Sequence, residues 1–236
     1  AKTFNNSVFV GGEFTLATSA SGNAVTLAGP VDLGGAARTI TVGIENSAIS
    51  GVIANGGLTK AGGNALILSA SNTFNGDTRI AAGVLYLDAT PGAPSGTSWA
   101  LRNSTVDLNG SDSGTLGFRG STGVTNAPVG GLKGSRNLSL LNSSGAPVSL
   151  MIGGNGQSTI YSGVLSGSGA SLTQPGAGTL TLSGANTFTG TTTVSAGRLL
   201  INGSTGNGAH TVANGGTLGG SGVIAAAKEV GFYVIS

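Results

Sequence analysis

The sequence predicts an all-β protein folded as a right-handed parallel β-solenoid (β-helix), and three observations carry this prediction. Gly is very abundant, at 45 of 236 residues, whereas charged residues make up only 8%. Short runs rich in Val, Leu, Ile and Thr alternate with these glycines; such runs favour strands, and Gly permits tight corners. One segment also recurs, because Leu58–Asp88 aligns without a gap with Leu172–Asn202. Recurrence on this scale is typical of solenoids.

Each copy of the recurring segment contains three short strands. Leu66 and Leu68 alternate with other residues in the first strand, as do Leu180 and Leu182 in its counterpart, so each strand presents Leu on one face. The six expected strands are Ala65–Ser69, Thr78–Ile80 and Leu85–Leu87 in the first copy and Thr179–Ser183, Thr192–Val194 and Leu199–Ile201 in the second.

The connections between these strands carry corner residues. Asn72 suits an Asx turn, and Phe74 is expected to plug the corner from inside. Gly83 is expected to bend the chain sharply at positive φ. The equivalent residues in the second copy are Asn186, Phe188 and Gly197.

Further strands follow the same pattern outside the two copies. Asn-Gly pairs separate many of them, and Asn-Gly is also a hairpin signal, so an antiparallel β-sandwich is the alternative fold. We prefer the solenoid because the strands come in triples and Gly marks corners. At ~20 residues per coil, roughly a dozen coils are expected. The additional strands are Ala24–Leu27, Arg38–Val42, Thr105–Leu108, Asn137–Leu140 and Thr211–Ala213.

The composition excludes several classes of protein. Gly does not fall at every third position and there are only 6 Pro residues, which excludes collagen. The mean hydropathy of +0.27 and net charge of +2 differ from those of disordered chains. The basic residues are scattered, so neither nucleic acid nor a membrane surface is an expected partner. No apolar run approaches the ~20 residues of a membrane span. Cysteine is absent, so no disulfide or thiolate metal site is expected.

We expect one solenoid domain over residues 1–236. The repeat units lie near 50–88 and 162–202, and the section 91–147 between them diverges from the pattern. An apolar strand is expected at 229–236, after a short linker.

The recurring motif, Leu-Thr-Lys-x-Gly followed by Leu-x-Leu-Ser-x-x-Asn-Thr-Phe-x-Gly-x-Thr and Ala-Gly-x-Leu, resembles the autotransporter-associated β-strand repeat. The complete form stands at Leu58–Leu85. This resemblance implies a passenger region of a bacterial surface protein, secreted or held at the cell surface. It implies a scaffold and leaves the activity open, because members of the family differ in what they do.

We expect no enzyme: no catalytic residue, no cofactor and no metal site are predicted. His210 has neither a second His nor a Cys to join it in a zinc site or a catalytic constellation, and is expected to be a surface or ladder residue. A polysaccharide-active enzyme remains an alternative, since stacking can bring distant acids together. Three or more carboxylates converging in one groove would favour it. The acids are Glu13, Asp32, Glu45, Asp77, Asp88, Asp107, Asp112 and Glu229.

The apolar ends of the chain predict self-assembly. A solenoid's terminal coils expose unpaired strands and usually need a polar cap, but here both ends are apolar. We therefore expect a non-catalytic extracellular structural protein that assembles head to tail with copies of itself into a surface fibre or filament, by strand addition. The residues expected at this contact are Phe4, Val8 and Phe9 at one end and Phe232, Tyr233, Val234 and Ile235 at the other.

The alternative function is a passenger-domain fragment of an autotransporter-like adhesin. Loops at Pro91–Pro94 and Gly120–Gly131 would then contact the target. Surface glycans, host cells and neighbouring cells are the partners expected in that case.

Overall fold

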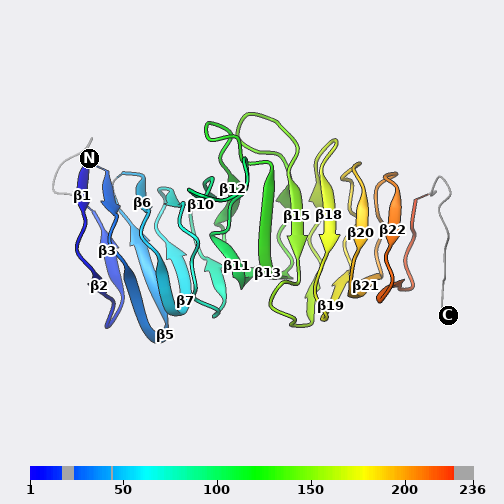
Figure 1. The fold of residues 1–236 in the computed structure, drawn as a ribbon, viewed down its shortest axis with the longest axis horizontal. Coiled ribbons are helices and arrows are strands. Elements are labelled where there is room, and N and C mark those ends of the chain that lie inside the picture. The colour runs from blue at the N-terminus through cyan, green and yellow to red at the C-terminus, as the bar shows by residue number, and fades with distance from the viewer. Residues whose placement is uncertain (18–23, 44, 226–236) are drawn as a thin grey trace.

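The computed structural model describes residues 1–17, 24–43 and 45–225, and it confirms the all-β parallel solenoid (Figure 1). The described residues form 23 strands and no helix, wound into about ten coils. Every pair of named strands in this part of the chain is parallel, which excludes the antiparallel β-sandwich. The coils are fewer than the dozen expected, because several carry loops that lengthen them beyond ~20 residues.

One face of the solenoid is a six-stranded sheet covering the N-terminal half of the rod. Its strands follow one another in chain order, with one or two strands of the larger sheet between each pair. In sheet order they are β1 (Lys2–Phe4), β4 (Val25–Leu27), β6 (Ser47–Ile49), β8 (Leu66–Leu68), β10 (Val84–Leu87) and β12 (Thr115–Phe118).

A 15-stranded sheet forms the remaining faces. Four long strands bend from one face to the next: β5 (Val31–Val42), β7 (Ile53–Ala61), β11 (Leu101–Leu108) and β13 (Asn126–Gly134). The bend is plain in β5, which pairs with β2 (Val8–Phe9) near its start and with β3 (Phe14–Leu16) near its end.

The remaining strands of this sheet are short. They are β9 (Thr78–Ile80), β15 (Ser149–Ile152), β16 (Thr159–Tyr161), β18 (Ser171–Gln174), β19 (Thr179–Leu182), β20 (Thr192–Val194), β21 (Gly197–Ile201), β22 (His210–Val212) and β23 (Gly216–Gly219). A separate pair consists of β14 (Leu138–Ser139) and β17 (Leu165–Ser166).

The core runs along the axis as columns of stacked apolar side chains. Leu180, Leu199 and Leu218 occupy the same register position in β19, β21 and β23, and all three are buried. The neighbouring positions in these strands are less buried, and they carry Thr, Arg or Gly except at Leu200. The alternation of apolar and polar residues thus places one side chain of each pair inside the rod, as predicted.

The corner asparagines differ from the prediction, because their side-chain oxygens bond between coils instead of closing an Asx turn. Asn72 Oδ1 accepts the Ile53 N–H of the preceding coil at 2.8 Å, and Asn72 Nδ2 donates to the Ala100 carbonyl of the following coil at 3.0 Å. Asn186 accepts from Leu165 N–H at 2.9 Å in the same manner. Each buried amide therefore links successive coils. Phe74 and Phe188 are buried core residues, as expected of corner plugs.

Lys60 and Gln174 occupy equivalent buried positions in the two copies. Lys60 Nζ donates to the carbonyls of Ala61 (3.0 Å), Gly62 (2.6 Å) and Ala82 (2.9 Å), at the corner where the chain turns into the next coil. The predicted bend at Gly83 is confirmed, with a φ of 66°.

The two copies of the repeat are rotated by one face relative to each other. Strand β9, the second element of the first copy, stacks through β11, β13 and β16 onto β19. Strand β19 is the counterpart of β8, the first element of the first copy, and not of β9. The section between the copies contains loops around β12 and before β15 that rise above the body of the rod (Figure 1). The prediction of a loop over Gly120–Gly131 is wrong in its second half, because residues from Asn126 onward belong to β13.

Candidate functional site

Charged residues gather along one edge of the solenoid as a ladder of alternating sign. Arg79, Asp107 and Lys133 are register partners on three successive strands, β9, β11 and β13. Lys133 Nζ contacts the Asp77 carboxylate and lies 3.8 Å from Asp107 Oδ2. The hydrogen bond to Asp77 and the nearby negative charges raise the pKa of Lys133. We call this set, with Asp112 and Arg136 described next, the charged edge.

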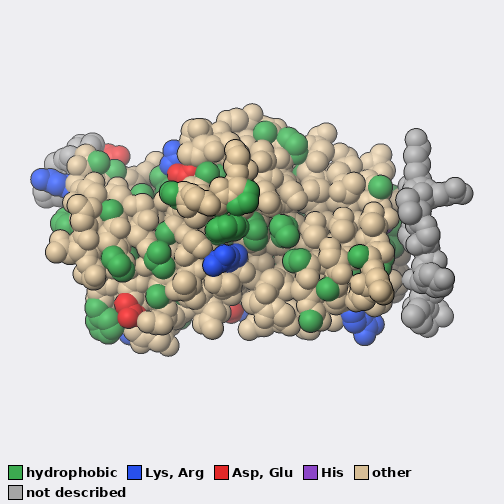
Figure 2. All heavy atoms as spheres, viewed as in Figure 1, with side chains coloured by type: hydrophobic (Ala, Val, Ile, Leu, Met, Phe, Trp, Pro, Cys, Tyr) green, Lys and Arg blue, Asp and Glu red, His purple; other side chains and the backbone are tan. Residues whose placement is uncertain are grey.

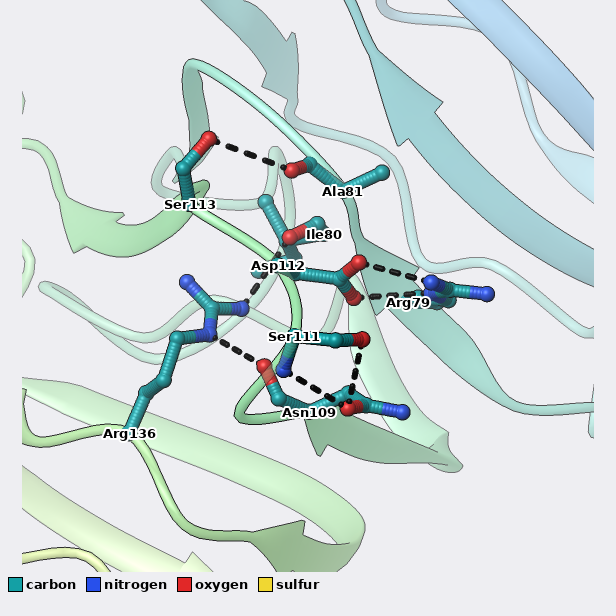
Figure 3. Close-up of polar contacts among 8 residues, drawn as sticks. All are labelled: Arg79, Ile80, Ala81, Asn109, Ser111, Asp112, Ser113 and Arg136. Atoms are coloured by element: carbon teal, nitrogen blue, oxygen red, sulfur yellow. Dashed lines mark hydrogen bonds and ion pairs between the residues drawn. The ribbon is translucent and has the colours of Figure 1, made fainter.

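A bidentate ion pair holds the loop after β11 against the charged edge (Figure 3). Arg79 Nε and Nη2 donate to Asp112 Oδ2 and Oδ1, each at 2.7 Å. This hydrogen bond lowers the pKa of Asp112 and raises that of Arg79. The bidentate geometry fixes the orientation of both groups as well as their separation.

The same loop is held from its other side by Arg136. Its Nε donates to the Asn109 carbonyl at 2.8 Å and its Nη2 to the Ile80 carbonyl at 3.0 Å. Within the loop, Asn109 Oδ1 accepts from both the N–H and the Oγ of Ser111 at 3.0 Å (Figure 3). The loop is therefore ordered by contacts on both sides, so a ligand would meet a surface that is already formed.

A groove of about 910 Å³ runs beside this edge, and its floor is bare backbone. A Cβ on Gly56 would lie 2.3 Å from the Ala36 carbonyl oxygen, and one on Gly76 would lie 2.5 Å from the Gly56 oxygen. Only Gly fits at both positions. The residues lining the groove are Asp32, Gly34, Gly35, Ala36, Ala37, Asn55, Gly56, Gly57, Thr59, Asn75, Gly76, Asp77, Arg79 and Asp107.

Three carboxylates line the groove, which is the arrangement that would favour a polysaccharide-active enzyme. Each of them is already paired, however. Asp32 accepts from the Gly34 N–H at 2.8 Å and from Asn55 Nδ2 at 3.1 Å, while Asp77 and Asp107 share Lys133. A glycosidase needs one carboxyl kept protonated by burial or by a neighbouring carboxylate. Open carboxylates bound to donors and to a lysine suit binding better than proton transfer.

Two further features are absent from the described part of the chain. It contains no group of three or more His, Cys, Asp or Glu residues placed to hold a metal ion. It also contains no helix with the length and apolar character needed to cross a membrane. His210 is a ladder residue aligned with Thr192, but it is buried rather than on the surface, and burial lowers its pKa.

The residues expected at the N-terminal contact fall into two places. Phe4 and Val8 line an apolar hollow of about 340 Å³ at the end of the rod, together with Phe14, Leu16 and Leu27. Phe9 lies on the outer side wall, 71% exposed, beside a different hollow that includes Asp32. The structure thus places Phe4 and Phe9 at different hollows, while Val8 lines both. Phe232, Tyr233, Val234 and Ile235 lie outside the described residues.

The sequence did not reveal the charged edge. Asp107 and Asp112 flank an Asn-Gly pair, and turn chemistry was a sufficient explanation for both. One signal in the sequence could have indicated it. Arg79, Asp107 and Lys133 each come directly after a residue that faces the core, and each lies in a strand of a different, successive coil. Their pairing becomes visible only when the irregular coil lengths in this section are known.

The parallel coils and the corner motifs define the class of this molecule, a β-solenoid built from passenger-type repeats. Residues 58–87 and 172–201 both match the family model of the passenger-associated-transport-repeat. The chain therefore contains two passenger-type repeats of the kind found in autotransporters, which indicates a secreted or cell-surface location.

A known relative agrees with this classification. The chain is 35% identical over 167 residues, 69% of its length, to the adhesin BmaC autotransporter of Brucella suis biovar 1 (strain 1330). It spans only 4% of the length of that protein. No solved structure matches the chain.

Proposed function

We propose that this chain is a non-catalytic section of a cell-surface passenger that displays an adhesive surface, and that the charged edge is part of this surface. One observation carries the proposal: two passenger repeats are built into one continuous solenoid that is similar to an autotransporter adhesin. The activity named for that relative is proposed here for this chain.

The location of the charges supports the charged edge as the contact surface. In a protein with only 8% charged residues, six charged side chains gather around one loop and one groove: Asp77, Arg79, Asp107, Asp112, Lys133 and Arg136. The ion pairs and hydrogen bonds hold them in place before any partner arrives, which reduces the ordering cost of binding. The expected partners are molecules of a host or neighbouring cell surface.

Adhesion of beads coated with the full chain to cultured mammalian cells tests this function. We expect adhesion above that of uncoated beads, and weaker adhesion at high salt because exposed charges are screened. The double variant Asp77→Asn, Lys133→Gln should reduce adhesion roughly fivefold or more. Arg198→Gln, at an exposed Arg on a distant coil, is the matched control. Absence of adhesion by a chain that shows a β-sheet circular dichroism spectrum would reject the proposal.

A second candidate function is head-to-tail assembly of copies of this chain into a fibre. It is supported by the apolar end hollow, where Phe4 is 50% exposed and Val8 lines the wall. The strands β1, β2 and β3 each pair on one side only among the described residues, and strand addition would use their other edges.

Negative-stain microscopy and sedimentation distinguish this candidate. Fibres of the wild-type chain that are lost on Phe4→Ser or on deletion of residues 229–236, and kept on Phe9→Ser, would support it. The Phe9 variant is the matched control because Phe9 is exposed but lies outside the end hollow. A chain that remains monomeric at high concentration would contradict assembly.

A further inference from the structure

A further hollow, of about 300 Å³, shares no lining residue with the groove of the charged edge. It is lined by Arg102, Asn103, Pro128, Val129, Met151, Gly154 and Pro175. Hydrophobic side chains and a basic one gather over β11, β13 and β15 in the middle of the face shown in Figure 2. We call this feature the Arg102 pocket.

The composition of the Arg102 pocket differs from that of the rest of the surface. The protein has one Trp and one Met; Met151 lines the pocket, and Trp99 packs directly against Arg102, with the guanidinium carbon 5.2 Å from the ring centroid. Aromatic residues, Met and Arg are the types enriched where proteins bind partners. Ser, Thr and Gly dominate elsewhere.

Arg102 supplies an uncompensated positive charge at this pocket. It is exposed, and no acidic side chain of the described residues lies within ion-pair distance of it. Stacking on Trp99 restricts the guanidinium without using its N–H donors, so these remain free for a ligand. A planar guanidinium fork matches the two oxygens of a carboxylate.

The other lining residues determine which uncharged groups a ligand can place in the pocket. Pro128 and Met151 are register partners on adjacent strands, and with Pro175 they form an apolar side. Asn103 Nδ2 donates to the Asn72 carbonyl at 3.2 Å, which leaves its Oδ1 to accept from a hydroxyl group. The pocket therefore offers an apolar surface, the Asn103 oxygen as a hydroxyl acceptor, and the Arg102 guanidinium. These three features fit a single ring that carries C–H faces, hydroxyls and a carboxylate.

We propose that the Arg102 pocket binds a carboxylate-bearing sugar of a cell-surface glycan. The carboxylate pairs with Arg102, a ring face packs on Pro128 and Met151, and a hydroxyl donates to Asn103. The pocket is short and the strands on either side of it are already paired, so it favours a single ring over an extended acidic peptide. The choice of a glycan rests on the proposed adhesive function.

Binding of free sugars to the full chain, measured by saturation-transfer NMR and calorimetry, tests this proposal. The probes are N-acetylneuraminic acid and glucuronic acid, each compared with its methyl ester, which keeps the ring and removes the charge. We expect the acids to bind and the esters to bind at least about tenfold more weakly, since a hydrogen bond to a charged group is lost. Equal binding of acid and ester, or no binding of either acid, would overturn the proposal.

Variants locate the site. Arg102→Gln should weaken binding of the acids about tenfold or more, and Met151→Glu should do the same by placing a negative charge at the wall without touching the core. Arg198→Gln should leave binding unchanged. Binding that survives both pocket variants would overturn the proposal, as would capture of a poly-glutamate peptide with no capture of either sugar.

The bead assay separates this inference from the proposed function. If coated beads adhere to cells but neither Arg102→Gln nor prior removal of acidic sugars from the cells reduces adhesion, the sugar proposal fails and adhesion stands. If the acids bind at Arg102 but beads do not adhere to cells, the adhesive function fails and the sugar site stands.

Discussion

Lys60 and Gln174 perform the same task in the two copies of the repeat, with different chemistry. Lys60 Nζ reaches three carbonyl oxygens, whereas Gln174 Nε2 reaches those of Gly176 and Gly178, at 3.3 and 3.2 Å. Gln174 Oε1 has no hydrogen-bond partner. The position therefore requires a buried donor, and a positive charge is one way to provide it.

Exchange of Lys60 tests this requirement. Lys60→Gln should cost little, because the second copy already uses Gln at the equivalent position. Lys60→Met should lower the free energy of unfolding by roughly 2–4 kcal/mol, since it leaves buried carbonyls without donors. Urea denaturation measures both. Equal stability of the Met and Gln variants would contradict the donor role.

The stability contributed by Lys60 should depend on pH. Burial lowers the pKa of Lys60 from its ordinary value of 10.5 to about 8. Between these values the unfolded chain holds more protons than the folded one, so the free energy of unfolding rises with pH, by a few kcal/mol at most. The difference in stability between wild type and Lys60→Gln isolates this contribution. We expect the difference to shift in favour of the wild type from pH 8 to pH 10.5; a flat difference would contradict it.

The coil-bridging role of Asn72 predicts a large effect for a small change. Asn72→Ala removes an acceptor and a donor that serve two different coils, and should destabilise the fold by roughly 2–3 kcal/mol. Asn75→Ala, at an exposed Asn three residues away, is the matched control and should be nearly neutral. Thermal unfolding followed by circular dichroism compares them, and similar losses in the two variants would argue against the bridge.

Gly56 should tolerate no side chain. Its φ is 137°, and a Cβ would lie 2.3 Å from the Ala36 oxygen of the neighbouring coil. Gly56→Ala should therefore destabilise the fold by more than about 2 kcal/mol. Gly63→Ala, where a Cβ meets nothing within 4 Å, should be neutral. A stable Gly56→Ala protein would show that the coils can separate locally at the floor of the groove.

Local sequence patterns predicted the strands well. They did not predict which residues of different coils contact one another. Thr78–Ile80 and Thr192–Val194 have the expected bounds because alternation and corner glycines are properties of adjacent residues. The bonds of Asn72 to Ile53 and Ala100 depend on which segments stack, and this follows from coil lengths that no local pattern reveals. For the same reason the Arg79–Asp112 pair, and with it the charged edge, was not anticipated.

The Arg102 pocket illustrates the same limit from another side. Trp99 and Arg102 are close in sequence, but Met151 and Pro175 join Arg102 only because β15 stacks on β13 and β18 stacks on β15. Composition did show that Trp and Met are single residues. It did not show that Met151 lines the hollow of the Arg102 that Trp99 packs against.

The rotation between the two repeats means that equivalent outer surfaces point in different directions from the rod axis. A flat, rigid target lying against one side of the rod can therefore touch a given outer surface of only one of the two copies at a time. A flexible chain that winds around the rod can reach both, and would gain avidity from the second contact. The irregular middle section thereby decides which shapes of target the two repeats can hold together.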